Sequence, residues 1–279
     1  MYYHNNKRDR LSEIFVDTKK QYETQPLLVS SCKYSSSHTI YINENDMIPV
    51  TAEMKVKYNE EAQIIVSSKR TFEAASEYAA KDISTCVHNF ASSMNPGGGV
   101  KHGSSAQEEC LCRCSTLYYS LNSRQAWDHF YTPHRQSSLS SLHNDDIIYT
   151  PGVKVFKTDT DFPEMMDVSQ WYDVNVITCA APDLYGCRED GQNVSPAELS
   201  AVHQRRLRRI LDLALINGNE AIILGAFGCG AFGNPPALAA SAAKSVIADY
   251  LRAFRVIEFA VYCRPPHFEN YEAFAKIMK

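Results

Sequence analysis

The chain has 279 residues, of which 44% are hydrophobic and 22% are charged, and its formal net charge is −4 at pH 7. This composition is typical of soluble globular proteins with a substantial core. The negative charge argues against a protein that binds nucleic acid mainly by neutralising phosphates. No apolar run approaches the roughly 20 residues that a membrane-spanning helix needs, so we expect no membrane partner.

The cysteines indicate a reducing compartment. There are nine, and the first ten residues, MYYHNNKRDR, are polar and charged, without the apolar segment of a secretion signal. We therefore expect free thiols in a cytoplasmic protein, or a nuclear one in a eukaryote. On a helix, Cys110 and Cys114 share a face and Cys112 points away, which does not close a tetrahedral metal site. We expect no metal and no cofactor.

Strands and helices alternate through the first part of the chain. The apolar spacing predicts helices at 8–23 and 71–80, with Pro26 ending the first. Extended segments are expected around 27–29, 39–42, 64–66 and 83–90.

The strand at 83–90 leads to three consecutive glycines at 97–99, which follow an Asn-Pro pair. Glycine adopts positive φ freely and lets backbone N–H groups approach a ligand closely. A helix is expected to begin near Ser104, because Ser104 and Gln107 match a capping box. A glycine loop before a helix start is typical of an anion or phosphate site. Glu108 and Glu109 would repel phosphate, so they must serve another part of the ligand.

A long polar segment separates this helix from the next strands. Residues 122–145 look irregular, and we expect them to shape access to the site. Strands are predicted at 147–149, 153–156 and 174–180, and the last is apolar enough for a sheet covered on both faces. It ends at Ala181-Pro182-Asp183, where an open α/β sheet binds ligands.

A second capping box, Ser195 to Glu198 with Pro196 between, starts a long amphipathic helix that stops at Asn217-Gly218. Four arginines cluster on this helix, at positions 205, 206, 208 and 209. The simpler interpretation is a solvated helix face. Contact with a nucleic acid or another polyanion is the alternative.

A second glycine loop, GAFGCGAFGN at 225–234, follows a strand at 221–224 and precedes a helix from Pro235-Pro236 to Ala253. A final strand is expected at 256–263. One glycine loop can hold a pyrophosphate, and the two aromatics of the second, Phe227 and Phe232, can stack on a sugar or a base. The alternation of strands and helices predicts a three-layer α/β/α domain.

Together the motifs resemble those of a known family. GGG, a gap of seven residues and then QEE is similar to the signature of the poly(ADP-ribose) glycohydrolases, which are macrodomain enzymes. The phrases NFASSMNPGGG, YTPGVKVF, ITCAAPD and LGAFGCGAFGNPP resemble the microbial-type branch, and the likeness covers about residues 8–275. It implies a single macrodomain over 1–279 with a mixed sheet and an N-terminal helical extension at about 1–50.

The resemblance also implies the ligand and the residue roles. ADP-ribose would lie between the two glycine loops, attached to protein, polymer or nucleic acid. Glu109 would be catalytic, and Glu108 would orient the ribose or the leaving group. The first loop would follow the distal ribose and diphosphate, the second would wrap the diphosphate, and Phe232 would pack on the distal ribose. The substrate-binding residues expected on this basis are Asn89, Asn95, Gly97, Gly98, Gly99, Val100, Gln107, Phe227, Gly228, Cys229, Gly230, Ala231 and Phe232.

The chemistry can also be argued from the helix itself. Adjacent residues project about 100° apart, so Glu108 and Glu109 cannot flank one bond as the carboxylates of ordinary glycosidases do. A single carboxylate must then act as acid and later as base. The leading hypothesis is a hydrolase of ADP-ribose glycosidic bonds on polymer or single ADP-ribosyl groups.

Three alternatives stay open at this point. The first is hydrolysis at an ADP-ribosylated nucleobase, and the second is a non-catalytic ADP-ribose-binding macrodomain. The third, a nucleotide-dependent oxidoreductase, is the weaker option.

Overall fold

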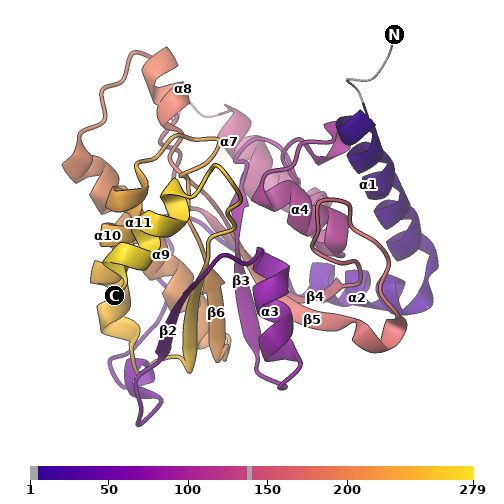
Figure 1. The fold of residues 1–279 in the computed structure, drawn as a ribbon, viewed down its shortest axis with the longest axis horizontal. Coiled ribbons are helices and arrows are strands. Elements are labelled where there is room, and N and C mark those ends of the chain that lie inside the picture. Colours follow the sequence, from indigo (N-terminus) through magenta and orange to yellow (C-terminus); the bar gives the residue numbers. More distant parts are fainter. Residues whose placement is uncertain (1–5, 137–139) are drawn as a thin grey trace.

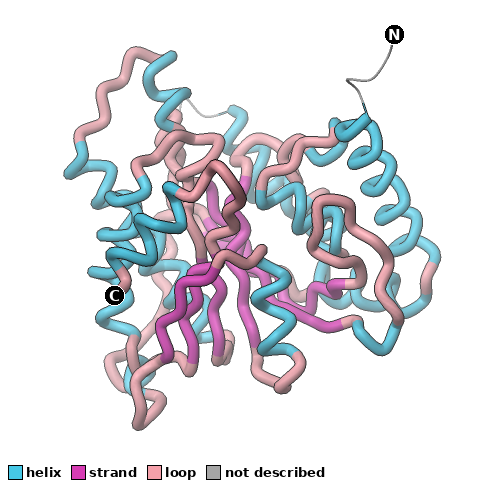
Figure 2. The backbone as a smooth tube through the Cα atoms, in the orientation of Figure 1, coloured by secondary structure: helices cyan, strands magenta, loops and turns pink. Residues whose placement is uncertain are grey.

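The computed structural model describes residues 6–136 and 140–279, and its centre is a mixed seven-stranded sheet with helices on both faces (Figures 1 and 2). The strand order is β1-β4-β5-β3-β6-β7-β2. Strands β5, β3, β6, β7 and β2 run parallel, whereas β4 is antiparallel to both β5 and β1. The predicted three-layer architecture is confirmed. The strands are β1 (Ile40–Ile42), β2 (Gln63–Ser67), β3 (Thr85–Ala91), β4 (Ile147–Val155), β5 (Tyr172–Ala180), β6 (Ala221–Leu224) and β7 (Val256–Ala260).

Two apolar cores form because side chains alternate across the central strands. In β3, Cys86 joins the core beneath α9, α10 and α11, and its neighbour Val87 joins the core beneath α3, α4 and α5. Figure 1 shows α9, α10 and α11 at the left of the sheet and α1 and α4 at the right. The α-helices are α1 (Asn6–Thr24), α2 (Pro26–Ser37), α3 (Thr71–Ala79), α4 (Gln107–Cys114), α5 (Leu117–Leu121), α6 (Arg124–Ala126), α7 (Thr132–Gln136), α8 (Leu184–Glu189), α9 (Pro196–Ile216), α10 (Pro236–Ile247) and α11 (Glu269–Ile277).

The sheet topology places the two glycine loops side by side. Strand β3 is paired with β5 on one side and with β6 on the other, all parallel. The chain leaves the carboxyl end of β3 into the first glycine loop and leaves the carboxyl end of β6 into the second. Ligands of open α/β sheets bind where neighbouring strands send their connections to opposite sides, and β3 is at such a point.

The N-terminal region is more helical than predicted. Pro26 does not end the helical region but occupies the first position of α2, where its missing N–H costs nothing. The Gln25 side chain accepts a hydrogen bond from the backbone N–H of Leu28 at 2.9 Å and caps the new helix. The predicted extended segment at 27–29 is therefore wrong, whereas the one at 39–42 is confirmed as β1.

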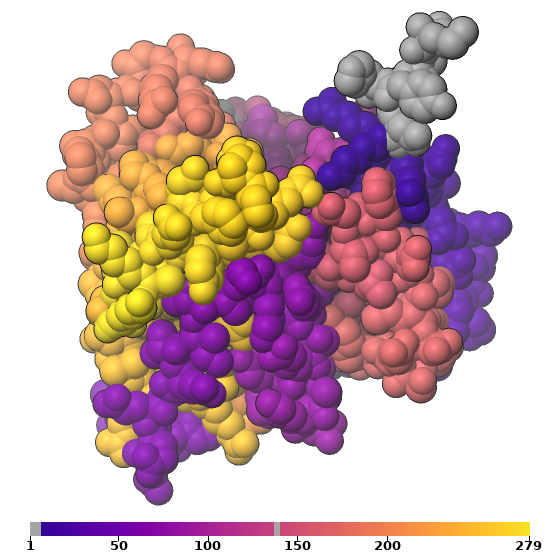
Figure 3. All heavy atoms as spheres, viewed as in Figure 1, coloured from indigo at the N-terminus to yellow at the C-terminus, as the bar shows by residue number. Residues whose placement is uncertain are grey.

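The N-terminal helix is part of the main body. Lys157 donates through Nζ to the carbonyl of Ile14 at 3.1 Å, and the Arg10 guanidinium lies 3.9 Å from the ring centre of Phe162. Figure 3 shows this helix (indigo) beside the salmon-coloured segment that follows β4.

Other element boundaries also differ. Part of the segment expected to be irregular is helical, with a π-helical turn at Trp127–Tyr131 between α6 and α7. The two strands predicted around Pro151 form one strand, β4, with an irregularity between Thr150 and Val153. Helix α10 and strand β7 end earlier than expected, at Ile247 and Ala260.

The structure bears on two expectations from composition, free cysteines and no membrane-spanning helix. All nine cysteines lie in the described ranges and are free thiols. No helix among the described residues is long and apolar enough to cross a bilayer.

The arginines of α9 differ in exposure: Arg205 and Arg208 are exposed, as a solvated face predicts, whereas Arg206 is not. Arg206 is fully buried, and its guanidinium pairs with Asp145 at 2.9 Å and donates to the carbonyls of Ala180 and Leu142. Arg205 pairs with the same carboxylate. These contacts join α9 to the segment before β4, so both sequence interpretations fail for Arg206.

This network predicts a large stability difference between two arginines of one helix. Arg206→Met leaves Asp145 and two carbonyls buried without that donor, so unfolding free energy should fall by about 3 kcal/mol or more. The control Arg208→Met removes a half-exposed pair with Asp249 and should cost less than about 1 kcal/mol. Urea denaturation of both variants measures this, and equal losses would contradict the structural role of Arg206.

Candidate active site

A cavity of about 890 Å³ opens at the carboxyl ends of the parallel strands, between the two glycine loops. Helix α4 contributes Gln107, Glu108 and Glu109 to its wall, and the second loop faces them across the cavity. Of the residues expected to bind substrate, those that line the cavity are Asn95, Gly98, Gly99, Gln107, Gly228, Gly230, Ala231 and Phe232. Five others do not line it: Asn89, Gly97, Val100, Phe227 and Cys229.

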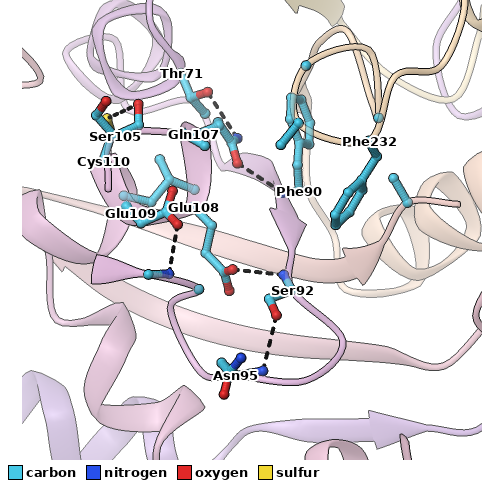
Figure 4. A pocket seen from close by; sticks show the side chains of 18 of the residues that line it. Thr71, Phe90, Ser92, Asn95, Ser105, Gln107, Glu108, Glu109, Cys110 and Phe232 are labelled. Atoms are coloured by element: carbon cyan, nitrogen blue, oxygen red, sulfur yellow. Dashed lines mark hydrogen bonds between the residues drawn. The ribbon is translucent and has the colours of Figure 1, made fainter. Parts of the chain in front are cut away.

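Glu109 lines the cavity, and its two carboxylate oxygens differ in their partners. Its Oε1 accepts a hydrogen bond from the backbone N–H of Gly99 at 2.8 Å (Figure 4). Its Oε2 is buried and has no hydrogen-bond partner among the described residues. Buried polar atoms are nearly always paired, so this oxygen is suited to a ligand hydroxyl or a water.

The position of Glu109 requires glycine in the loop. Gly98 has φ of 55°, a left-handed conformation that other residues rarely adopt. A Cβ atom on Gly98 would lie 2.5 Å from Glu109 Oε1. The backbone therefore approaches the carboxylate at a distance that no side chain permits.

Glu108 points the other way, toward the end of β3. Its Oε2 accepts from the backbone N–H of Ser92 at 2.8 Å, and its Oε1 accepts from the amide of Asn89 at 3.3 Å. Burial raises the pKa of Glu108 to about 8, and the neighbouring charge of Glu109 acts in the same direction. Donors on Ser92, Asn89 and Gly97 oppose this rise but do not cancel it.

The first glycine loop and the end of β3 thus donate their N–H groups to the chain's own carboxyl groups. The N–H groups of Ser92 and Gly99 are taken by Glu108 and Glu109. Both glutamates lie in the first turn of α4, where the helix dipole favours negative charge. The sequence predicted that Glu108 and Glu109 would repel a phosphate bound at this loop. The structure removes this conflict, because these N–H groups bind the glutamates instead of a phosphate.

Gln107 has a different role from the one its spacing predicts. Helix α4 begins at Gln107 with Ala106 as its N-cap, and no side chain caps it, so the predicted Ser104 cap is wrong. Gln107 accepts from the N–H of Phe90 at 2.9 Å and donates to the His88 carbonyl and the Thr71 hydroxyl. One amide group therefore fixes α4 to β3 and to α3, which sets the direction of the glutamates.

The second loop presents free backbone donors. The N–H groups of Gly228, Gly230, Ala231 and Phe232 have no hydrogen-bond partner within residues 6–136 and 140–279. Successive unpaired N–H groups on a glycine loop at a sheet edge suit a phosphate. Asn234 holds this loop in shape, because its amide donates to the carbonyls of Pro182 and Gly228 at 2.7 and 3.0 Å. Its Oδ1 lies 2.9 Å from His203 on α9.

Several cavity residues were not found from the sequence. Most belong to segments distant in the chain, and no motif marks them; they include Arg70, Thr71, Phe90, Asp159, Tyr262 and Asn270. For the segment at 122–145, only its length and polarity indicated a place near the site. Three of its residues, Asn122, Trp127 and Arg135, line the cavity, so the segment forms part of the site.

No group of three potential metal ligands from His, Cys, Asp and Glu occurs in the part of the chain that the structure describes.

Comparisons with known proteins agree on one family. Residues 14–158 match the family described as microbial-type PARG, catalytic domain. A poly(ADP-ribose) glycohydrolase structure from Thermomonospora curvata has a TM-score of 0.83 at 28% identity, covering 97% of this chain and 100% of that one. The corresponding Deinococcus radiodurans structure, in complex with ADP-ribose, has a TM-score of 0.78 at 30% identity, covering 88% and 96%.

A Thermomonospora curvata structure bound to the inhibitor ADP-HPD is also similar, with a TM-score of 0.80 at 28% identity, covering 96% of this chain and 99% of that one. No match is found among curated protein sequences.

The raised pKa of Glu108 predicts a pH dependence of stability. A carboxyl group whose pKa rises from 4.5 to about 8 on folding stabilises the protein fully below pH 4.5, and this contribution is lost as the pH rises through 8. Glu108→Gln, which cannot ionise, should therefore gain stability relative to the parent between pH 4.5 and 8, by on the order of 4 kcal/mol.

Denaturant unfolding at pH 4.5, 6 and 8 measures this gain. Glu13→Gln, at an exposed position on α1, is the matched control. Parallel profiles of unfolding free energy against pH for the parent and Glu108→Gln would contradict a raised pKa of Glu108.

Proposed function

The chain belongs to the microbial-type poly(ADP-ribose) glycohydrolases, and we propose that Glu109 carries out its catalytic proton transfers while Glu108 positions the substrate. It is a hydrolase that cleaves the glycosidic bond at the ribose of ADP-ribose modifications and releases ADP-ribose.

One observation carries the assignment of Glu109. This carboxylate is fixed by a single backbone N–H, and its other oxygen is buried at the cavity without a partner in the described ranges. Glu108, in contrast, has both oxygens engaged by Ser92 and Asn89. A group that exchanges protons with a substrate needs an oxygen that is not already engaged, and of the two glutamates only Glu109 has one within the described residues.

The reaction then needs one carboxyl group in two roles. The Glu109 carboxyl donates its proton to the leaving oxygen as the bond from that oxygen to the ribose C1 atom breaks, and the ribosyl group becomes an oxocarbenium ion. A water molecule then attacks C1, and the Glu109 carboxylate accepts the proton from it. The carboxyl group is unchanged after one turnover, and the products are ADP-ribose and the protonated leaving group.

The second loop supplies the diphosphate site in this proposal. Four of its residues line the cavity and have backbone N–H groups without a partner in the described ranges. Figure 4 shows Phe232 of this loop across from the two glutamates. A diphosphate on these donors places the distal ribose between Phe232 and Glu109. Phe232 is partly exposed in the cavity, so it can pack on a sugar face.

The activity test compares three substrates: poly(ADP-ribose), mono-ADP-ribosylated protein and ADP-ribosylated DNA. We expect release of ADP-ribose by the parent, and a fall of roughly 10²- to 10⁴-fold for Glu109→Gln, the range typical of a lost general acid and base. Binding of ADP-ribose to Glu109→Gln is the control for folding. Near-normal turnover by this variant would overturn the role of Glu109, and binding without cleavage by the parent would indicate a reader of ADP-ribose.

A glycine pair tests the placement of Glu109. Gly98→Ala forces a Cβ atom against Glu109 Oε1, whereas a Cβ atom on Gly230 meets nothing within 4 Å. We expect Gly98→Ala to lower kcat at least tenfold, because a displacement of about 1 Å costs that much or more. Gly230→Ala should change KM more than kcat, since it only narrows the diphosphate site. Similar kinetic effects for the two variants would argue against a precisely held Glu109.

A further inference from the structure

A buried cation lies on the same helix as the two glutamates. Arg113 comes four residues after Glu109 in α4, is 1% exposed and forms no salt bridge within the described ranges. Burying a charge without a carboxylate partner costs free energy, and an apolar side chain of similar length would avoid that cost. Core packing alone therefore does not explain an arginine at this position.

The guanidinium of Arg113 is hydrogen-bonded to the segment that precedes its own helix. Its Nη1 donates to the carbonyl of Ser104 at 2.6 Å, and its Nη2 donates to Sγ of Cys110 at 3.7 Å. Its Nε is buried and has no partner in the part of the chain that the structure describes. Hydrogen bonds from a charged donor are stronger than neutral ones. The side chain therefore fixes the position of Ser104 relative to α4.

Ser104 in turn sets the place of Gly99. The backbone N–H of Ser104 donates to the Gly99 carbonyl at 3.2 Å, and a Cβ atom on Gly99 would overlap the Ser104 hydroxyl. The N–H of Gly99 donates to Glu109 Oε1 at 2.8 Å, and the other oxygen of that carboxylate has no partner within residues 6–136 and 140–279. Helix α4 thus holds the loop at two points, Ser104 and Gly99.

Helix α1 covers the outer side of the same loop, and Figure 1 shows α1 beside α4. The Thr18 hydroxyl donates to the backbone carbonyl of Arg113 at 2.6 Å. Gly103 packs so closely against α1 that a Cβ atom on it would overlap the Arg8 carbonyl. These contacts keep the loop folded, but none of them holds Ser104. The side-chain hydrogen bond to Ser104 comes from Arg113.

We propose that Arg113 is a positioning residue for the hydrolysis: it fixes Ser104 and, through Gly99, the carboxylate of Glu109. Arg113 does not line the cavity, so it acts without touching the substrate. This inference rests on the proposed function, since Glu109 is the group whose position Arg113 sets. The second loop, which holds the diphosphate in that proposal, has no hydrogen bond to Arg113 in the described ranges. Loss of Arg113 therefore affects the chemical step rather than substrate binding.

The first experiment measures kcat and KM on poly(ADP-ribose) for the parent, Arg113→Met and Arg113→Lys. Methionine keeps an unbranched side chain without a donor, whereas lysine keeps a charge and a donor. We expect Arg113→Met to lower kcat about tenfold or more and to change KM less than about threefold, because a displacement of about 1 Å suffices for such a loss. Arg113→Lys should recover part of the lost kcat, since its ammonium can donate to the same carbonyl.

Calorimetric titration with ADP-ribose counts the sites that are folded and able to bind. Arg206→Met is the matched control, because Arg206 is also a buried arginine of a helix but lies on the opposite face of the sheet. This control should lose stability as well, whereas its kcat per binding site should stay within about twofold of the parent.

A cycle of single and double variants tests whether Arg113 acts through Glu109. If it does, adding Arg113→Met to Glu109→Gln should leave kcat within about threefold of Glu109→Gln alone, because the group that Arg113 positions is already gone. A merely structural role would lower kcat by the same factor in both backgrounds.

Three results would overturn the inference: kcat of Arg113→Met within about twofold of the parent, a rise in KM without a loss of kcat, or the same loss factor in both backgrounds. Should Arg113→Met not fold, Arg113→Lys replaces it in the cycle, with an expected fall in kcat of about threefold that disappears in Glu109→Gln. Near-normal turnover by Glu109→Gln would refute the proposed role of Glu109. A strong loss in Glu109→Gln with an equal further loss from Arg113→Met would refute only this inference.

Discussion

Two adjacent carboxyl groups are buried at the first turn of one helix, and much of the architecture follows from the need to hold them there. Glu108 and Glu109 are 3% and 7% exposed, so neither is stabilised by bulk water. Burying two charges side by side is costly without donors. The structure meets this with backbone N–H groups from the β3 end and the glycine loop, and by raising the pKa of Glu108 so that it keeps its proton at neutral pH.

The two carboxyl groups are held by backbone N–H groups rather than by positively charged side chains. Their positions therefore depend on the glycines and on the sheet. The loop can approach Glu109 only because Gly98 has no Cβ atom. The loop in turn starts from β3, whose register with β5 and β6 is fixed by parallel pairing. Gln107 connects α4 to the same strand, so the strand, the loop and the helix form one rigid frame around the carboxyl groups.

Local sequence patterns predicted the strands, the loops and the glutamate pair better than they predicted the contacts between distant side chains. The glycine loops, the strands on either side and the glutamate pair follow from spacing and from the need for positive φ, and the microbial-type glycohydrolase resemblance identified the family. The sequence could not show that Gln107 would bond to β3 instead of capping a helix, because its partners His88 and Phe90 come from another element. The sequence predicted that Arg206 is solvated. Its partner Asp145 lies 61 positions away in the chain, and only the fold brings the two side chains together. The sequence did not identify Arg135 for the same reason: it contacts Asn95 only because helices replace the expected irregular segment.

The central claim is that a glutamate with one free oxygen, Glu109, faces the scissile ribose, while Glu108 is held by the protein. A crystal structure of Glu109→Gln with ADP-ribose tests this most directly. We predict that the distal ribose lies between Phe232 and residue 109, with its C1 atom within about 4 Å of that side chain, close to the distance needed for reaction. A distal ribose on the far side of Phe232, or a C1 atom nearer to Glu108 than to residue 109, would contradict it.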